Sequence, residues 1–212
     1  EVLWLDMYSN PPSRVVNDQS RPFGRWNNPP SDEYTMSRFL EFREENDADF
    51  DAVARLHDTA FGGGMESRIV TRIRQGHRPY LSYVALSDST VCGHALFSEV
   101  DVIGARTSAV AVALGPVAVL PARQLQGIGT QLIRHGLKWC REHHYETCFV
   151  LGDPAYYCRF GFCQAFVSGF WFGTRRDRPA FQILPLDQGS ADLPRGEVRY
   201  APVFYEEEES VN

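Results

Sequence analysis

One short segment has the composition of an anion-binding loop: Gln124, Leu125, Gln126, Gly127, Ile128, Gly129 and Thr130. It follows an apolar run and opens a stretch with helical hydrophobic spacing. Backbone N–H groups in the first turn of a helix lack partners within the helix and lie at the positive end of its dipole, so they bind phosphates. The two glycines allow close approach to the backbone. The segment predicts a pyrophosphate site, with an ordinary strand-to-helix turn as the alternative.

Two other phosphate-binding loops do not fit this segment. A Walker A loop requires a lysine before the Ser or Thr, whereas Gly129 precedes Thr130. A Rossmann fingerprint requires a third small residue, and Leu132 stands at that position. The pattern therefore indicates neither class of nucleotide-binding protein.

The flanking residues predict the elements that position this loop. Residues Ser108–Leu120 are almost all apolar, as in a strand covered on both faces, and Gly115 and Pro116 should interrupt its hydrogen bonds. After the loop, one apolar stripe at helical spacing predicts a long amphipathic helix: Ile128, Leu132, Ile133, Gly136, Leu137 and Cys140.

The rest of the chain predicts alternating strands and helices. A helix should be capped by Asn46 or Asp47, and a short helix that carries two tyrosines should be capped by Asp153 with Pro154 at its first position. A further helix and the remaining strands are expected over these ranges: Met65–Gln75, and Phe39–Phe42, Leu81–Ser87, Val91–Ile103 and Thr147–Leu151.

Bulk properties predict one domain without nucleic-acid or membrane partners. We expect an extended or disordered arm over residues 1–37, a folded domain over 38–205 and an acidic tail over 206–212. The net charge of −6 gives no basic footprint, and no apolar run reaches the roughly 20 residues that span a bilayer. The five cysteines form no CxxC pair, so we expect no metal site and a cytoplasmic, reducing location.

Several segments together resemble the GNAT superfamily of N-acetyltransferases, in its YhbS-like branch. The similarity spans roughly residues 38–205, outside the amino-terminal arm. It rests on the loop described above and on four further stretches: GHALFS at 93–98, LGPVAVLP at 114–121, VLGDPAYYCRFGF at 150–162 and VRYAPVF at 198–204.

The resemblance implies a fold, a cosubstrate and a set of site residues. The fold would be α/β (α+β): a central mixed, mostly antiparallel sheet flanked by helices, with two parallel strands splayed at a bulge to admit acetyl-CoA. The backbone of Val117, Ala118 and Val119 would bind the pantetheine arm, and residues 124–130 would hold the pyrophosphate. Many members have Arg or Gly where Leu125 and Gln126 stand, so binding would depend on backbone donors and on Arg123.

The implied activity is transfer of the acetyl group of acetyl-CoA to an amine by direct attack in a ternary complex. Tyr157 matches the family's Tyr-x-x-x-Gly-Phe pattern and would protonate the departing thiolate, with Tyr156 as its nearest competitor. The N–H of Val117 would stabilise the oxyanion. The acceptor would be a small-molecule or peptide amine, and the protein a monomer or homodimer.

The general base stays open at the level of sequence. Many members carry a glutamate on the strand before the bulge, where this chain has only Ala109–Leu114. Glu99 and His94, on the neighbouring predicted strand, are candidates, but a surface carboxylate and a core histidine are the commoner roles of such residues. Residues Phe170–Phe172 are interpreted either as strand core or as a wall of the acceptor cleft.

Two other function classes compete with a GNAT enzyme. One is a GNAT-shaped module that binds coenzyme A without catalysis, and the other is a protein-interaction domain that has lost the cosubstrate. Gly127, Gly129 and Tyr157 together favour the enzyme.

Overall fold

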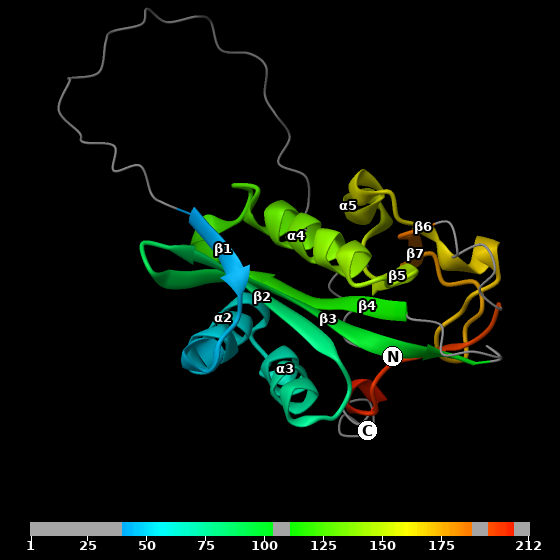
Figure 1. Cartoon of the computed structure of the whole chain (residues 1–212), viewed down its shortest axis with the longest axis horizontal. Coiled ribbons are helices and arrows are strands. Elements are labelled where there is room, and N and C mark those ends of the chain that lie inside the picture. Colours follow the sequence, from blue (N-terminus) through cyan, green and yellow to red (C-terminus); the bar gives the residue numbers. More distant parts are fainter. Residues whose placement is uncertain (1–39, 104–110, 188–194, 206–212) are drawn as a thin grey trace, which may run out of the picture.

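In the computed structural model, which describes residues 40–103, 111–187 and 195–205, an eight-stranded sheet lies at the centre of the molecule (Figure 1). Along the sheet the strand order is β1-β2-β3-β4-β5-β7-β6, and β8 pairs with β3 off this path. All pairs are antiparallel except β4 with β5, as the family resemblance implied. The strands are β1 Leu40–Glu44, β2 Tyr80–Ser87, β3 Thr90–Val102, β4 Ala111–Val119, β5 Thr147–Leu151, β6 Cys163–Gln164, β7 Phe181–Pro185 and β8 Val198–Arg199.

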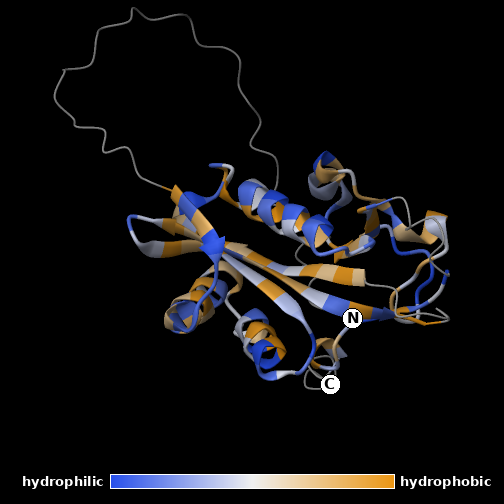
Figure 2. Cartoon of the chain, in the orientation of Figure 1, coloured by the Kyte–Doolittle hydropathy of each residue, from blue (hydrophilic) through white to orange (hydrophobic). Residues whose placement is uncertain are grey.

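Helices cover both faces of the sheet. The helices α2 and α3 pack on one face, and α4 packs on the other beside the short α5 (Figure 1). Hydrophobic residues are concentrated in the central strands, whereas the outward side of α4 is mainly hydrophilic (Figure 2). The α-helices are α2 Phe50–Phe61, α3 Met65–Gln75, α4 Ile128–Glu142 and α5 Pro154–Tyr157, and the 3-10 helices are η1 Asp47–Asp49, η2 Pro121–Arg123, η3 Cys158–Phe160 and η4 Ala165–Ser168.

The apolar stripe on α4 fixes this helix against the sheet. All six residues of the predicted stripe are buried. Gly136 is required at the closest approach, because a Cβ at this position would overlap the ring of Phe97 on β3. The packing therefore holds the first turn of α4 in a defined place relative to β3 and β4.

The strand β4 is interrupted at Gly115 and Pro116, as its sequence predicts. Its register with β3 shifts there, because Gly115 and Pro116 together lie opposite one β3 residue, Leu96. The parallel pairing of β4 with β5 also ends here, at Leu114 opposite Val150. Beyond this point β4 continues to Val119 and β5 ends at Leu151. The two parallel strands therefore separate at a bulge.

Most other predicted elements are confirmed with small changes. The helix Met65–Gln75, the strand Thr147–Leu151 and the short helix capped by Asp153 have the predicted bounds or cap. Phe170 and Phe172 are core residues but lie outside the strands, because Trp171 and Phe172 form only isolated bridges. The predicted arm at 1–37, the acidic tail at 206–212 and residues 108–110 of the predicted central strand lie outside the described residues.

Candidate active site

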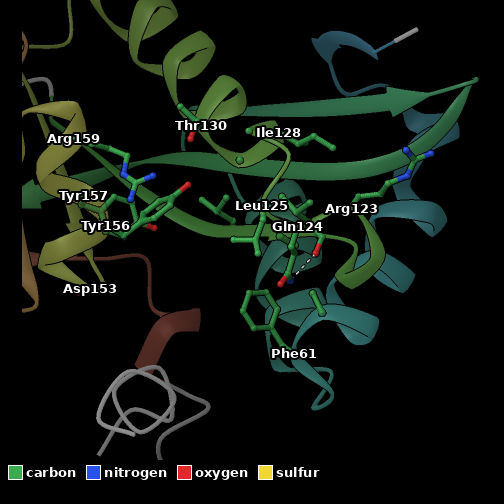
Figure 3. Close-up of a pocket in the computed structure, with 16 residues that line it drawn as sticks. Phe61, Arg123, Gln124, Leu125, Ile128, Thr130, Asp153, Tyr156, Tyr157 and Arg159 are labelled. Carbon is green, nitrogen blue, oxygen red and sulfur yellow. Dashed lines mark hydrogen bonds between the residues drawn. The ribbon is translucent and has the colours of Figure 1, made fainter. Parts of the chain in front are cut away.

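A pocket of about 580 Å³ opens where β4 and β5 separate (Figure 3). Figure 3 shows Tyr156, Tyr157 and Arg159 on one side of the pocket, and Gln124 and Arg123 on the other. Its lining residues come from the end of α2, from β4, from the loop and first turn of α4, and from α5 with η3: Ala60, Phe61, Val117, Ala118, Val119, Arg123, Gln124, Leu125, Gly127, Ile128, Gly129, Thr130, Asp153, Tyr156, Tyr157 and Arg159.

The loop before α4 presents its backbone to this pocket. Gly127 is the N-cap residue, with φ +82° and ψ 0°, and no side chain caps the helix. A Cβ on Gly127 would meet no atom within 4 Å, so its left-handed backbone, rather than crowding, favours glycine. The N–H groups of the first turn are therefore open to an anion in the pocket.

Nine of the ten residues predicted to bind the cosubstrate line the pocket. The exception is Gln126, whose Nε2 donates a hydrogen bond to the carbonyl of Ala122 at 3.3 Å. Gln124 instead fixes the loop to the end of β4, because its Nε2 donates to the carbonyl of Val119 at 3.2 Å.

Both candidate tyrosines reach the pocket from α5. Tyr157 is buried, and its ring packs so closely on Gly152 that a Cβ there would overlap it. Tyr156 is half-buried, with its ring centroid 5.0 Å from that of Tyr157 in an edge-to-face arrangement. Its hydroxyl oxygen lies 3.2 Å from the Cβ position of Gly129 on α4. The pocket therefore contains both tyrosines, and Tyr156 lies nearer to the first turn of α4.

Four lining residues received no site role from the sequence: Ala60, Phe61, Asp153 and Arg159. Asp153 was predicted only as a helix cap, a role that it does perform, with Oδ1 accepting from the Ala155 N–H at 2.9 Å. Arg159 stacks over the ring of Tyr156, with its guanidinium carbon 4.5 Å from the centroid. No local pattern marks Ala60 and Phe61, since tertiary packing alone brings the end of α2 to the pocket.

Comparison with known proteins agrees with this geometry. Residues 50–162 match the acetyltransferase (GNAT) family. The chain belongs to this family. The N-acetyltransferase YhbS of Escherichia coli K12 is 33% identical over 166 residues, which cover 76% of this chain and 96% of YhbS. The N-acetyltransferase YjhQ of the same organism is 33% identical over 123 residues, which cover 57% of this chain and 68% of YjhQ.

Two solved GNAT structures also resemble the chain. The crystal structure of E. coli YhbS in complex with CoA has a TM-score of 0.75 at 29% identity, covering 82% of this chain and 96% of that one. A GNAT acetyltransferase from Brucella melitensis in complex with acetyl-CoA has a TM-score of 0.65 at 35% identity, covering 79% of this chain and 99% of that one.

Neither residue considered as the base of this GNAT domain lines the pocket. Glu99 accepts a hydrogen bond from the hydroxyl of Tyr145 at 3.1 Å. Burial and the adjacent Glu99 carboxylate raise the pKa of Tyr145. His94 is fully buried, and its Nε2 lies 2.7 Å from the hydroxyl of Ser82. Both residues therefore have structural partners elsewhere.

His94 belongs to a buried polar chain of five residues: Arg74, Glu45, Ser82, His94 and His57. The guanidinium of Arg74 forms an ion pair with Glu45, and both side chains are almost fully buried. Ser82 donates to Glu45 at 2.6 Å, and the Nδ1 of His94 lies 2.8 Å from the Nε2 of His57. An ionised carboxylate only accepts hydrogen bonds, so the hydroxyl hydrogen of Ser82 is used by Glu45. The hydroxyl oxygen of Ser82 therefore accepts from the Nε2–H of His94.

Burial sets the charge states of the ionisable side chains in this buried polar chain. It lowers the pKa of His57 from 6.5 to about 3, with Arg74 adding to the effect and Asp58 opposing it. Burial, His57 and Arg74 lower the pKa of His94. Burial also raises the pKa of Glu45, against the hydrogen bond from Ser82 and the charge of Arg74. The histidines are therefore neutral near pH 7.

Two kinds of feature are absent from the described residues. None of the described helices is long and apolar enough to cross a membrane. No group of three or more His, Cys, Asp or Glu within residues 40–103, 111–187 and 195–205 could hold a metal ion.

Proposed function

We propose that this GNAT protein transfers the acetyl group of acetyl-CoA to an amine, by direct attack within a ternary complex. The observation that carries the proposal is the convergence on one pocket of three parts that the reaction needs. These are the first turn of α4, the segment Val117–Val119 of β4 and the side chain of Tyr157. Two relatives of at least 29% identity were crystallised with CoA or acetyl-CoA, which supports the same cosubstrate here.

We expect the parts of acetyl-CoA to bind along the pocket lining. Beyond Leu114, β4 pairs with β3 on one side but no longer with β5, so its other backbone edge is available to the amides of the pantetheine arm. The pyrophosphate would bind the N–H groups after Gly127. Arg123 and Arg159 add positive charge to the lining.

The proposed chemistry uses groups at the β4 end of the pocket. A lysine-like amine with a pKa near 10.4 loses its proton at pH 7 at a cost of about 4 to 5 kcal/mol. The neutral amine then attacks the acetyl carbonyl, and the N–H of Val117 would stabilise the oxyanion. As the carbon–sulfur bond breaks, Tyr157 would protonate the thiolate.

Turnover distinguishes an enzyme from a binding module. Isothermal titration calorimetry with acetyl-CoA tests the site, and release of free thiol tests transfer to spermidine, a lysine-containing peptide, an amino sugar and hydroxylamine. Binding without thiol release from any of these amines would favour the module that binds coenzyme A without catalysis. Absence of binding would contradict the proposal altogether.

The tyrosine pair tests the proposed acid. Tyr157→Phe should lower kcat by about 10²-fold, at the lower end of general acid catalysis because a thiolate is a good leaving group, and should keep acetyl-CoA affinity. Tyr156→Phe is the matched control on the same helix and should lower kcat much less. Full kcat in Tyr157→Phe together with a large loss in Tyr156→Phe would assign the acid to Tyr156.

A further inference from the structure

Asp153 is the only carboxylate among the described residues that line the pocket. The other charged lining residues in this part of the chain are Arg123 and Arg159. A carboxylate repels the phosphates of coenzyme A, so it is unsuited to the part of the pocket that holds them. A carboxylate in the pocket would instead suit a positively charged group.

The separation of β4 and β5 brings Asp153 to the same pocket as the β4 backbone that would hold the acetyl group. The parallel strands pair as far as Leu114 and Val150 and then separate. Val117 lies on β4 three residues beyond Leu114, Asp153 lies two residues beyond the end of β5 at Leu151, and both line the pocket. The carboxylate is therefore expected across the opening from the backbone that would hold the thioester.

Local hydrogen bonds hold Asp153 in place and leave one carboxylate oxygen available. Oδ1 accepts from the N–H of Ala155 at 2.9 Å, and the backbone carbonyl accepts from the N–H groups of Tyr156 and Tyr157 at 3.0 Å each. Within the described residues, Oδ2 has no hydrogen bond and Asp153 forms no ion pair. A half-buried carboxylate with a spare oxygen is a site for an ammonium group.

We propose that Asp153 binds the ammonium group of the acceptor and takes its proton as the new carbon–nitrogen bond forms. The inference rests on the proposed acetyl transfer and adds that the acceptor is a cationic amine. It also supplies the general base that the sequence left open, in place of Glu99 and His94.

The protons and bonds balance in this step. The ammonium nitrogen gives one proton to Asp153, attacks the acetyl carbonyl carbon and forms the carbon–nitrogen bond. The carbon–sulfur bond then breaks, and the thiolate takes a proton from Tyr157. The nitrogen loses its second proton, which replaces the one that Tyr157 gave, and Asp153 releases its own to solvent. The products are an amide, free coenzyme A and one proton.

Asp153→Asn separates this role from the role in capping. Asparagine caps a helix as well as aspartate does, so α5 and its tyrosines should keep their positions while the charge and the proton acceptor are lost. Asp153→Ser, which also caps, is the second variant if the first proves unstable. Glu99→Gln is the control for loss of a carboxylate outside the pocket. Calorimetry with acetyl-CoA and thermal unfolding check that each variant is intact.

The test compares a cationic acceptor with an uncharged one. Spermidine is protonated at neutral pH, whereas hydroxylamine is already uncharged. We expect Asp153→Asn to lower the ratio of kcat/KM for spermidine to kcat/KM for hydroxylamine by about 10²-fold. Glu99→Gln should leave this ratio unchanged.

The contrary results distinguish failure of this inference from failure of the proposed function. If Asp153→Asn lowers both rates equally, the inference is wrong and the proposed transfer stands. The same holds if the wild type acetylates hydroxylamine but none of the cationic amines. If the wild type releases no thiol with any acceptor, the proposed function fails and the inference fails with it.

Discussion

The buried polar chain and the pocket lie next to each other, yet their polar groups differ in whether they have hydrogen-bond partners within the protein. His94 on β3 is paired in register with Ala118 of β4, which lines the pocket. In the buried polar chain, consecutive side chains from Arg74 to His57 hydrogen-bond one another and are almost fully buried. In the pocket, Oδ2 of Asp153 and the first-turn N–H groups of α4 lack such protein partners among the described residues.

This difference shows that residue type alone does not identify a functional site. Histidine and glutamate are residue types that often act in catalysis, but here two histidines and a glutamate join a hydrogen-bonded chain inside the core, with Nδ1 of His57 left without a hydrogen bond to any described residue. Glycines and an aspartate cap look ordinary in the sequence, but they line a cavity in which Oδ2 of Asp153 and the first N–H groups of α4 have no hydrogen-bond partner among the described residues. Unsatisfied polar groups beside a cavity are the better indicator of function.

The largest effect is expected on stability, from breaking the buried chain. Glu45→Ala would leave the guanidinium of Arg74 buried without its partner and should lower the free energy of unfolding by about 3–5 kcal/mol. Glu142→Ala removes the partner of Lys138 in an exposed ion pair and should cost at most about 0.5 kcal/mol. Urea unfolding measures both. Equal losses would contradict the distinction between the buried and the exposed pair.

The second prediction concerns the pocket and affects binding rather than stability. Gly127→Val places a branched side chain in a left-handed conformation, with its Cβ in open space at the proposed phosphate site. We expect acetyl-CoA affinity to fall by about 10²-fold, measured by calorimetry. Gly173→Val is the matched control, since Gly173 has φ +65° and open space but lies outside the pocket lining. Equal losses of affinity would show that backbone strain, and not the loop, accounts for the effect.

The third prediction uses pH to test the buried histidines. His57 titrates near 6.5 when unfolded and near 3 in the fold. Between these values the unfolded chain binds a proton that the folded chain does not, so stability falls as the pH drops through this window, by at most about 1.4 kcal/mol per pH unit. His57→Gln should reduce this slope, whereas His77→Gln, at an exposed position, should not. Urea unfolding from pH 4 to 8 measures it, and an unchanged slope in His57→Gln would contradict the assignment.

The smallest effect is expected from the amino terminus. We propose that residues 38–205 fold as one domain, because the composition of residues 1–37 predicts too little apolar surface for burial to offset the entropy of ordering them. A chain that begins at Met36 should keep its Tm within about 2 °C. A sharp decrease in Tm would instead show that aromatic residues such as Trp4 and Trp26 pack on the domain.

The sequence by itself determined the elements and the loop of this site. Hydrophobic spacing predicted α4 and its buried face, Gly115 and Pro116 predicted the interruption of β4, and Asp153 and Pro154 predicted the start of α5. These features are local, because each depends on backbone freedom, missing donors or side-chain periodicity within a few residues. The family resemblance added the cosubstrate and the tyrosine, which local patterns could not specify.

Only the tertiary structure decided which residues share the pocket and which are sealed in the core. Phe61, Asp153 and Arg159 reach the pocket from three elements that no periodicity connects, and Glu45 meets Ser82 across 37 positions of the chain. Whether a titratable side chain pairs with a partner or faces a cavity depends on such long-range packing. Desolvation and pairing then set its charge, so the same histidine or aspartate has a different role in each environment.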